Sequence, residues 1–236
     1  MSPREDQIAN GYEINDLAKE ESWRMFQIIG ELVEGFDRLS GVEPAVTIYG
    51  SARLNIDDKL YTQTQGIAYG LGKLGFSIIT GGGPGVMEAA NRGAREAGAK
   101  SFGLHIELPD EQTCNVYTTD SIRFNHFFAR KVMLVKYATA FVIMPGGVGT
   151  LDELTEVLVL MQTHKIKPFP IVLFDSKFWK GFLRWLQNTV LAEKFISEDN
   201  LDLLRVCDRA DEVIDMIQKW YQKQEVTGRK ALIKEV

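Results

Sequence analysis

The sequence has few cysteines, no long apolar stretch and no cluster of basic residues. Its two cysteines, Cys114 and Cys207, have neither a CxxC nor a zinc-binding spacing, so we expect free thiols in a reducing compartment. No apolar run approaches the roughly 18 residues that a membrane span requires. The polar segment 1–10 lacks the apolar core of a secretory signal. We therefore expect a soluble, cytoplasmic protein without a membrane partner.

The charge balance is mildly acidic. The 236 residues include 27 Lys and Arg against 32 Asp and Glu, a formal net charge of −5. Nucleic-acid-binding domains carry a basic surface, so we expect no nucleic-acid partner, although a small cationic site for an anion stays open. The histidines, His105, His126 and His164, have no metal-ligand spacing. The sequence predicts no metal site and no cofactor.

From Ala45 onward, short apolar runs alternate with helical patterns. We expect strands at 46–50, 77–80, 101–106, 140–144 and 170–174, and helices at 58–74, 86–97, 121–137, 151–162, 177–191 and 210–224. Continuous apolar strands are typical of a parallel sheet buried on both faces. Helix-length connections imply right-handed crossovers. The predicted fold class is α/β, a Rossmann-like doubly wound parallel sheet.

A helical pattern precedes this alternation, between residues 13 and 40. Large apolar side chains, including Trp23, Phe26 and Phe36, recur there at helical spacing, and Gly41 ends the pattern. The helix either packs on its own domain or contacts another subunit. We divide the chain into an N-terminal helical extension (1–43), a Rossmann-like domain (44–225) and a polar C-terminal tail (226–236).

Glycine clusters follow two of the expected strands. The first loop has the sequence GGGPG at 81–85, and the second has PGGVGT at 145–150. Ligands of open α/β sheets bind at the carboxyl ends of strands. A glycine loop that leads into a helix presents free N–H groups and a positive dipole end to an anion. Alternatively, each loop contains glycine only because a tight strand-to-helix turn requires it. Neither is a GxGxxG or Walker A motif, so two such loops together suggest one nucleotide with a single phosphate.

Charged residues accompany the second loop. Thr150 and Glu153 have the spacing of a helix capping box, in which Glu153 would bind the Thr150 backbone N–H. The same position would bring its carboxylate beside a bound sugar, and the residues alone leave both roles open. Arg130 and Lys131 interrupt an apolar helical pattern. Adjacent helical residues point about 100° apart, so at most one of this pair faces a given pocket. A surface position is the alternative.

Three motifs, in this order, resemble those of the LONELY GUY (LOG) family. Residues 80–88 are similar to its glycine-rich first loop, Arg130-Lys131 to its RK pair, and PGGVGTLDE at 145–153 to its PGGxGTxxE motif. The resemblance covers about 45–175. It implies an enzyme that hydrolyses the N-glycosidic bond of adenosine-type nucleoside 5′-monophosphates, AMP or N6-substituted cytokinin nucleotides, to the free base and ribose 5-phosphate. Some members have been labelled lysine decarboxylases, but no pyridoxal-phosphate site is recognisable here.

The resemblance also implies roles for individual residues. Arg130 and Glu153 would be the catalytic pair. The substrate-binding residues would be Gly82, Gly83, Glu88, Glu111, Lys131, Gly146, Gly147, Gly149 and Thr150. Glu111 is chosen over Glu107 as an upstream acidic contact. The N-terminal helix resembles the extended bacterial branch of the family, so we expect a homo-oligomer, a dimer or a larger ring up to a hexamer.

Two other functional classes remain compatible with these residues. A carrier or sensor of a nucleotide or cofactor would use the same fold without catalysis, and the fold alone does not separate it from an enzyme. A structural or assembly protein would leave both glycine loops without a ligand. The presence of Glu153 together with Arg130 favours the enzyme, because a binding protein needs neither.

Overall fold

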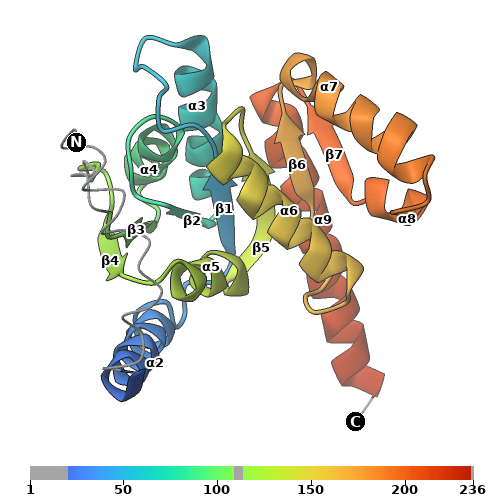
Figure 1. The fold of residues 1–236 in the computed structure, drawn as a ribbon. Helices are drawn as coiled ribbons and strands as arrows, with labels where there is room; N and C mark the ends of the chain where they lie inside the picture. Colours follow the sequence, from blue (N-terminus) through green and yellow to red (C-terminus); the bar gives the residue numbers. More distant parts are fainter. Residues whose placement is uncertain (1–20, 109–113, 235–236) are drawn as a thin grey trace, which may run out of the picture.

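The structure, a computed structural model, describes residues 21–108 and 114–234. Its parallel strands form one sheet in the order β4-β3-β2-β1-β5-β6-β7 (Figure 1). The strands are β1 (Ala45–Tyr49), β2 (Ser77–Thr80), β3 (Ser101–Ile106), β4 (Asp120–Phe124), β5 (Ala138–Ile143), β6 (Ile171–Phe174) and β7 (Leu204–Cys207). The strand order reverses between β1 and β5, and this arrangement confirms the predicted doubly wound α/β fold.

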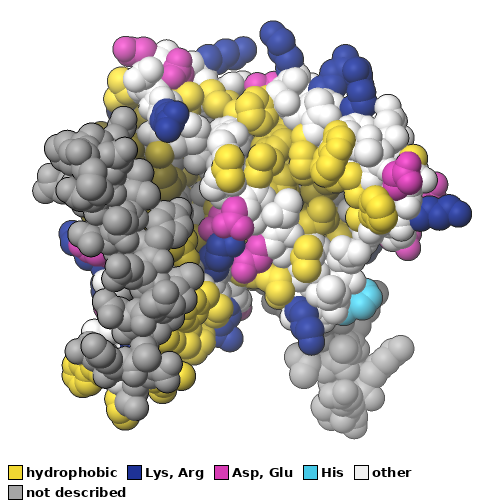
Figure 2. Space-filling view, in the orientation of Figure 1, with side chains coloured by type: hydrophobic (Ala, Val, Ile, Leu, Met, Phe, Trp, Pro, Cys, Tyr) yellow, Lys and Arg dark blue, Asp and Glu magenta, His cyan; other side chains and the backbone are white. Residues whose placement is uncertain are grey.

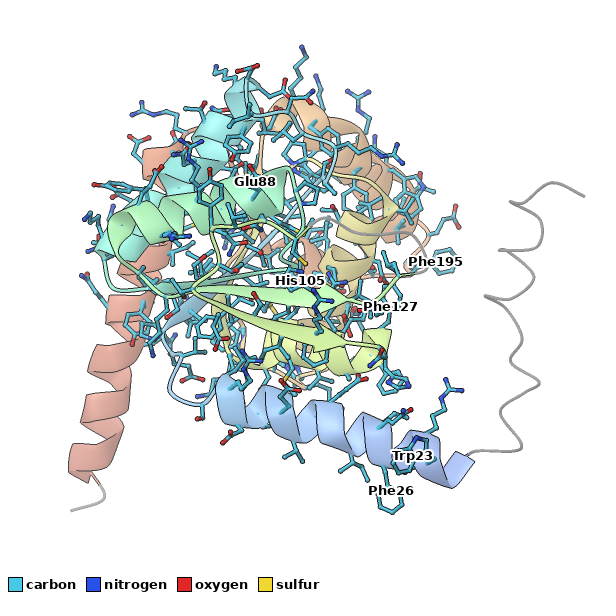
Figure 3. The ribbon with its side chains drawn as sticks, turned by 90° about the vertical axis from the view of Figure 1, so that its left-hand side faces the viewer. Trp23, Phe26, Glu88, His105, Phe127 and Phe195 are labelled. Atoms are coloured by element: carbon cyan, nitrogen blue, oxygen red, sulfur yellow. The ribbon has the colours of Figure 1, made fainter. Side chains whose placement is uncertain are left out.

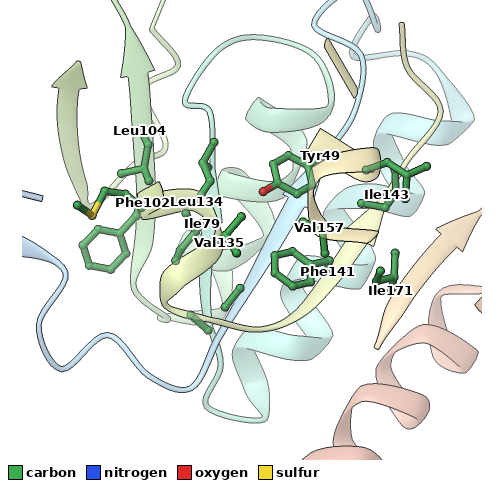
Figure 4. Packing of buried hydrophobic residues seen from close by; sticks show 14 of the residues in the cluster. Tyr49, Ile79, Phe102, Leu104, Leu134, Val135, Phe141, Ile143, Val157 and Ile171 are labelled. Atoms are coloured by element: carbon green, nitrogen blue, oxygen red, sulfur yellow. The ribbon is translucent and has the colours of Figure 1, made fainter. Parts of the chain in front are cut away.

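Helices cover both faces of the sheet. One face carries α3 (Lys59–Lys73), α4 (Val86–Ala97) and α9 (Ala210–Lys234), and the other carries α5 (Phe127–Lys136), α6 (Val148–Gln162) and α7 (Ser176–Trp185). The chain between α7 and β7 forms a π-helical segment, η2 (Leu186–Leu191), and a short helix, α8 (Glu198–Leu201). Each face buries its own apolar cluster. Figure 4 shows part of the cluster under α5 and α6, around Phe141 and Val157.

The helical extension is present as α2 (Glu21–Arg38), which lies beside α5 at one edge of the molecule (Figure 1). The first eight residues of the predicted helix lie outside the described part of the chain. Along α2, Trp23, Phe26 and Phe36 are exposed, whereas Glu31 is buried. The apolar stripe read from the sequence is therefore largely an outer face, and the polar residue Glu31 contacts the domain together with Leu32.

One expected element was wrong, and one strand was not predicted. The segment predicted as one helix from 121 to 137 is strand β4 followed by α5, because Ile122 and Phe124 are buried while Arg123 between them is exposed. β4 pairs with β3 from Phe102 to Ile106. The edge strand β7 was not predicted, since four residues give too short an apolar run to recognise.

Two expectations from composition can be compared with the structure. No helix in the described part of the chain is both long enough and apolar enough to cross a membrane. Cys114, which is exposed, and Cys207, which is buried, are both free thiols, as expected.

Candidate functional site

A cavity of about 590 Å³ lies at the switch point of the sheet, beyond the carboxyl ends of β1 and β5. Its walls come from the loops after β1 and β2, from α5 and from the start of α6. The described residues that line it are Ile48, Tyr49, Gly50, Ser51, Ala52, Arg53, Gly81, Met87, Phe127, Arg130, Gly147, Val148, Gly149, Thr150, Asp152 and Glu153. Volume and position are those of a small-molecule site in an open α/β fold.

The second glycine loop presents the start of α6 to this cavity. The helix begins at Val148, and its N-cap residue, Gly147, has no side chain to bond the first N–H groups. A Cβ atom at Gly147 or at Gly149 would meet no described atom within 4 Å. Free N–H groups and the positive end of the helix dipole therefore face open space, an arrangement suited to an anion.

The capping-box alternative for Glu153 is wrong. Because α6 begins at Val148, Thr150 lies inside the first turn and its backbone N–H donates to the carbonyl of Gly147 at 3.0 Å. Glu153 lies in the second turn, and its Oε2 atom is buried without a hydrogen-bond partner in the described chain. Its carboxylate is thus free to act on a ligand in the cavity.

Arg130 reaches the same cavity from α5. Its Nε atom is also buried without a hydrogen-bond partner among the described residues. A Cβ atom at Gly81 would lie 2.6 Å from an Nη atom of Arg130, so a side chain there would displace the guanidinium. Burial raises the pKa of Glu153 to about 7, although Lys131 and Arg130 act in the opposite direction. At neutral pH a substantial fraction of Glu153 is therefore ionised and a substantial fraction protonated.

Lys131 points to a different place from Arg130, as the helical geometry predicts. Its Nζ atom lies 2.8 Å from Oδ2 of Asp152 and 3.2 Å from Oε2 of Glu156. Burial opposes the charge on Lys131, but these carboxylates and Glu153 outweigh it and raise the pKa of Lys131. In Figure 2, acidic and basic side chains accordingly meet near the middle of the face, between α5 and the start of α6. Lys131 is not part of the cavity lining.

The first glycine loop is held by a buried polar network. The Asn115 side-chain amide donates to the carbonyls of Gly82 and Gly83 at 2.9 and 3.0 Å. Gly82 has a φ of +73°, and a Cβ atom there would lie 2.3 Å from the ring of His105. Neither Gly82 nor Gly83 lines the cavity. Glu88 does not line it either, because its Oε1 atom accepts a hydrogen bond from the Tyr61 hydroxyl at 2.9 Å.

The remaining predicted residues are Gly146, Thr150 and Glu111. Gly146 lies at the base of the second loop, where a Cβ atom would be 2.1 Å from Oγ1 of Thr150. Thr150 is buried and lines the cavity. Glu111 lies outside the described residues, whereas Glu107 forms a long ion pair with Arg123 at 3.9 Å.

Ser51, in the loop after β1, joins the two glycine loops. Its backbone N–H donates to the carbonyl of Pro145 at 3.1 Å, and its carbonyl accepts from the N–H of Val86 at 2.9 Å. A Cβ atom at Gly85 would lie 2.5 Å from that carbonyl. Backbone hydrogen bonds of Ser51 therefore hold the ends of β1, β2 and β5 close together beside the cavity.

The structure adds residues that the sequence gave no reason to select. Tyr49 lines the cavity at the end of β1, and Arg53, Met87, Phe127 and Asp152 also contribute to its walls. Phe127 is more than half exposed, which is unusual for a phenylalanine beside a polar site (Figure 3). Tyr49 had one usable signal, since it is the last residue of a strand that ends at the switch point.

A carboxylate from the helical extension holds the start of α5. Glu31 accepts hydrogen bonds from the backbone N–H and the side-chain amide of Asn125, at 3.1 and 2.9 Å, and from the backbone N–H and Nδ1 of His126 at 3.2 and 3.1 Å. His126 is the N-cap residue of α5. The helix that carries Arg130 is therefore anchored through α2.

A metal ion or a pyridoxal-phosphate cofactor would require particular side chains among those described. Within residues 21–108 and 114–234, no group of three or more His, Cys, Asp or Glu side chains is placed to hold a metal ion. The described lining of the cavity also contains no lysine, the residue with which pyridoxal-phosphate enzymes form a Schiff base. The cavity does not fit that cofactor.

A family model described as "Possible lysine decarboxylase" matches residues 87–217, more than half of the chain. The chain belongs to this family. The matched region contains α5 with Arg130, the second glycine loop and α6.

Curated relatives carry the names of nucleotide-cleaving enzymes. The rice (Oryza sativa subsp. japonica) protein named cytokinin riboside 5′-monophosphate phosphoribohydrolase LOG is 30% identical, over 64% of this chain and 63% of that protein. A Mycobacterium tuberculosis protein with the same enzyme name is 29% identical, over 59% and 75% of the two chains. An Escherichia coli K12 protein named pyrimidine/purine nucleotide 5′-monophosphate nucleosidase is 28% identical, over 62% of this chain and 34% of its own. These relatives confirm the resemblance to the LOG family.

Solved structures share the fold. A structural-genomics target superposes with a TM-score of 0.57 at 21% identity, over 74% of this chain and 98% of that one. The molybdenum cofactor carrier protein of Chlamydomonas reinhardtii gives a TM-score of 0.53 at 20% identity, over 75% and 96%. At these identities the likeness shows the fold and nothing about activity. The chain also spans less than two thirds of the rice relative.

Proposed function

We propose that this protein hydrolyses the N-glycosidic bond of adenosine-type nucleoside 5′-monophosphates and releases the base and ribose 5-phosphate. The observation that carries the proposal is the buried carboxylate of Glu153, whose Oε2 atom has no described partner, in a cavity that also receives the uncapped start of α6. Burying an unpaired carboxylate costs several kcal/mol. Such a group is expected at a functional site rather than in a purely structural one.

The substrate's phosphate would bind at the start of α6. Backbone N–H groups from Gly147 to Gly149 would face it, and the absence of side chains at Gly147 and Gly149 lets the phosphate approach the backbone. Arg53, from the loop after β1, adds a cation to the cavity lining. The sugar would then lie toward Glu153, and the base toward the apolar side chains of Met87 and Phe127. These two residues suit adenine and N6-substituted adenines alike.

The chemistry follows from the charge that develops when the bond breaks. Cleavage of an N-glycosidic bond gives the ribose oxocarbenium character, which an ionised Glu153 stabilises. With a pKa of about 7, this carboxylate is also well suited to take a proton from water at neutral pH. Arg130, next to it, would bind the leaving base or balance charge near the phosphate. Lys131 would contribute indirectly, through its ion pairs with Asp152 and Glu156.

The second candidate function is that of a carrier without catalysis. Molybdenum cofactor carrier proteins share this fold, which gives this alternative a concrete example. A carrier needs the anion site at the start of α6 but gains nothing from an unpaired buried carboxylate beside it. The two functions differ in one measurable way: a carrier binds its ligand and returns it unchanged.

We also propose that the protein forms a homo-oligomer through α2. Trp23 and Phe26 are 64% and 68% exposed and belong to the outer face of this helix, where Phe26 points away from the rest of the molecule (Figure 3). Large exposed apolar patches mark interaction surfaces. Light scattering should give a mass above one chain, and Trp23→Ser with Phe26→Ser should lower it. A single-chain mass for the unaltered protein at working concentration would contradict this proposal.

The deciding experiment is chromatographic analysis of base release from a panel of nucleoside 5′-monophosphates, AMP, N6-isopentenyl-AMP, GMP and CMP. The same nucleosides without phosphate serve as the control for the phosphate site. We expect release from the adenosine-type nucleotides and at least about 100-fold slower release from the nucleosides. Arg130→Ala should lower turnover by about 100-fold. Binding of nucleotides without release of base from any of them would favour the carrier.

A further inference from the structure

The hydroxyl of Tyr49 has no structural purpose in the described chain. The residue is 94% buried, since its exposed fraction is 6%. Its ring stacks on Phe141 with centroids 6.3 Å apart, and in Figure 4 it lies directly above Phe141 and Val157. A phenylalanine would make the same packing contacts. The Oη atom is buried yet has no hydrogen-bond partner among the described residues, a loss of about 1–3 kcal/mol relative to a satisfied hydroxyl.

Three unpartnered polar atoms come together in this cavity. They are Oη of Tyr49 from β1, Nε of Arg130 from α5 and Oε2 of Glu153 from α6. Each is close enough to the other two to interact with them electrostatically: Glu153 raises the pKa of Tyr49 after burial itself, and Arg130 lowers it. The other nearby carboxylates, Asp152 and Glu156, already pair with Lys131. Tyr49 therefore adds a neutral hydroxyl to the cavity that holds Arg130 and Glu153.

We infer that Tyr49 is a third catalytic residue, whose hydroxyl and the Glu153 carboxylate together hold the water that attacks the sugar. This inference rests on the proposed hydrolysis. The water would direct one O–H to Oε2 of Glu153 and the other to the Tyr49 oxygen, which leaves a lone pair for C1′. Buried waters typically make about three hydrogen bonds to polar groups that lack other partners, and the substrate supplies the third contact.

The step balances as follows. The water oxygen bonds to C1′, and the bond between C1′ and the base nitrogen breaks with its electron pair going to the base. One proton of the water passes to Glu153, which later returns it to solvent, and the base nitrogen takes up one proton. The sum is one water consumed, with one base and one ribose 5-phosphate formed. Tyr49 stays a neutral phenol throughout, since burial and then the charges of Glu153 and Glu156 raise its pKa well above the usual value.

The test is Tyr49→Phe, with Tyr137→Phe as a matched control. The Tyr137 hydroxyl donates to the Phe36 carbonyl and lies away from the cavity. For Tyr49→Phe we expect at least a tenfold lower kcat, roughly the scale of one positioning contact. The KM and the Kd for ribose 5-phosphate should stay within about twofold, and the melting temperature should be equal or higher because an unsatisfied hydroxyl is removed. Tyr137→Phe should keep its kcat within about twofold.

A double variant separates a shared role from an independent one. If Tyr49 and Glu153 hold the same water, Tyr49→Phe should cost little more once Glu153→Gln is present, because groups that act as a unit are non-additive. A kcat for Tyr49→Phe within twofold of the unaltered protein would overturn the inference. So would a raised KM with unchanged kcat, which would mean a contact to the sugar instead. If the unaltered protein releases no base from any nucleotide, the proposed function fails and this inference falls with it.

Discussion

The two glycine loops lie at the carboxyl edge of one sheet, on either side of the end of β1, but their glycines have different surroundings. In the first loop, Gly82 has a left-handed backbone and no room for a Cβ atom beside His105. Its carbonyl and that of Gly83 are fixed by Asn115. In the second loop, Gly147 has an ordinary extended backbone, and neither it nor Gly149 would clash with any described atom if it carried a side chain.

The difference indicates which glycines the fold needs and which a ligand would need. Glycine is required in the first loop by backbone conformation and by packing, both of which are complete within the described chain. In the second loop nothing in the chain accounts for Gly147 and Gly149, and the space they leave is the cavity itself. The fold thus accounts for glycine at position 82, whereas Gly147 and Gly149 leave open space that a ligand could use.

The largest effect on stability is expected for Gly82→Ala, which tests whether the fold requires glycine in the first loop. The new Cβ atom would lie 2.3 Å from the His105 ring, at a φ of +73° that disfavours any side chain. Overpacking and left-handed strain together should cost about 3 kcal/mol of unfolding free energy. Urea denaturation measures it. Unfolding free energy unchanged within error would show that the first loop is not held as described.

Glu153→Gln tests whether the second loop adjoins a reactive site, because it removes a carboxylate beside that loop without changing the shape of the cavity. We expect base release to fall by at least about 100-fold. Nucleotide binding and stability should change little, since Gln has nearly the same volume. Glu193→Gln, at an exposed position in the turn after η2, is the matched control. Near-normal turnover by a folded Glu153→Gln protein would remove Glu153 from the reaction.

The pH dependence should follow from the same carboxylate. A general base acts in its ionised form, and the pKa of Glu153 is about 7. The value of kcat/KM should therefore rise with pH through neutrality, roughly tenfold between pH 6 and pH 8. The residual activity of Glu153→Gln should lack this rise. A profile that falls over the same range would mean that Glu153 acts as an acid instead.

Much of this architecture could be predicted from the sequence, and the reasons differ by region. Continuous apolar runs such as those of β1 and β5 identify buried parallel strands, and the motif around Glu153 identifies the family. Strand β4 could not be predicted, because Ile122 and Phe124 continue into the apolar pattern of α5, and only pairing with β3 makes that segment extended. The strand therefore depends on a tertiary contact rather than on local preference.

How much of the candidate site could be predicted depends on whether a motif or the packing of the chain decides a residue's position. Arg130 and Glu153 line one cavity, as the motifs imply. The direction of Lys131 depends on where α6 places Asp152 and Glu156, which a motif does not state. Tyr49 was missed because its role depends on a hydroxyl that lacks a partner, and a sequence does not reveal hydrogen-bond partners.

A smaller effect is expected for Gly149→Ala, the counterpart of Gly82→Ala. A methyl group there meets no described atom and replaces glycine within a helix, so stability should be unchanged or rise by up to about 1 kcal/mol. The methyl group would enter the phosphate site, and the KM for AMP should rise by about fivefold. Steady-state kinetics and thermal unfolding measure both. Loss of stability without a change in KM would mean that the fold requires glycine in the second loop as it does in the first.

The smallest effect is expected for Glu31→Gln. This substitution weakens the hydrogen bonds that hold the start of α5, the helix that carries Arg130. Burial alone would raise the pKa of Glu31, but hydrogen bonds from Asn125 and His126 outweigh it and lower the pKa. A lowered carboxyl pKa adds stability above the unfolded-state value of about 4.5, and this stability is lost as pH falls through the folded-state value. Glu31→Gln should therefore lower the free energy of unfolding by about 1 kcal/mol at pH 7. This difference from the unaltered protein should disappear below pH ~4.5.

Glu34→Gln is the control, because it removes only an exposed ion pair with Arg38 and should cost under about 0.5 kcal/mol. Equal losses in the two variants would mean that α2 does not anchor α5 through Glu31.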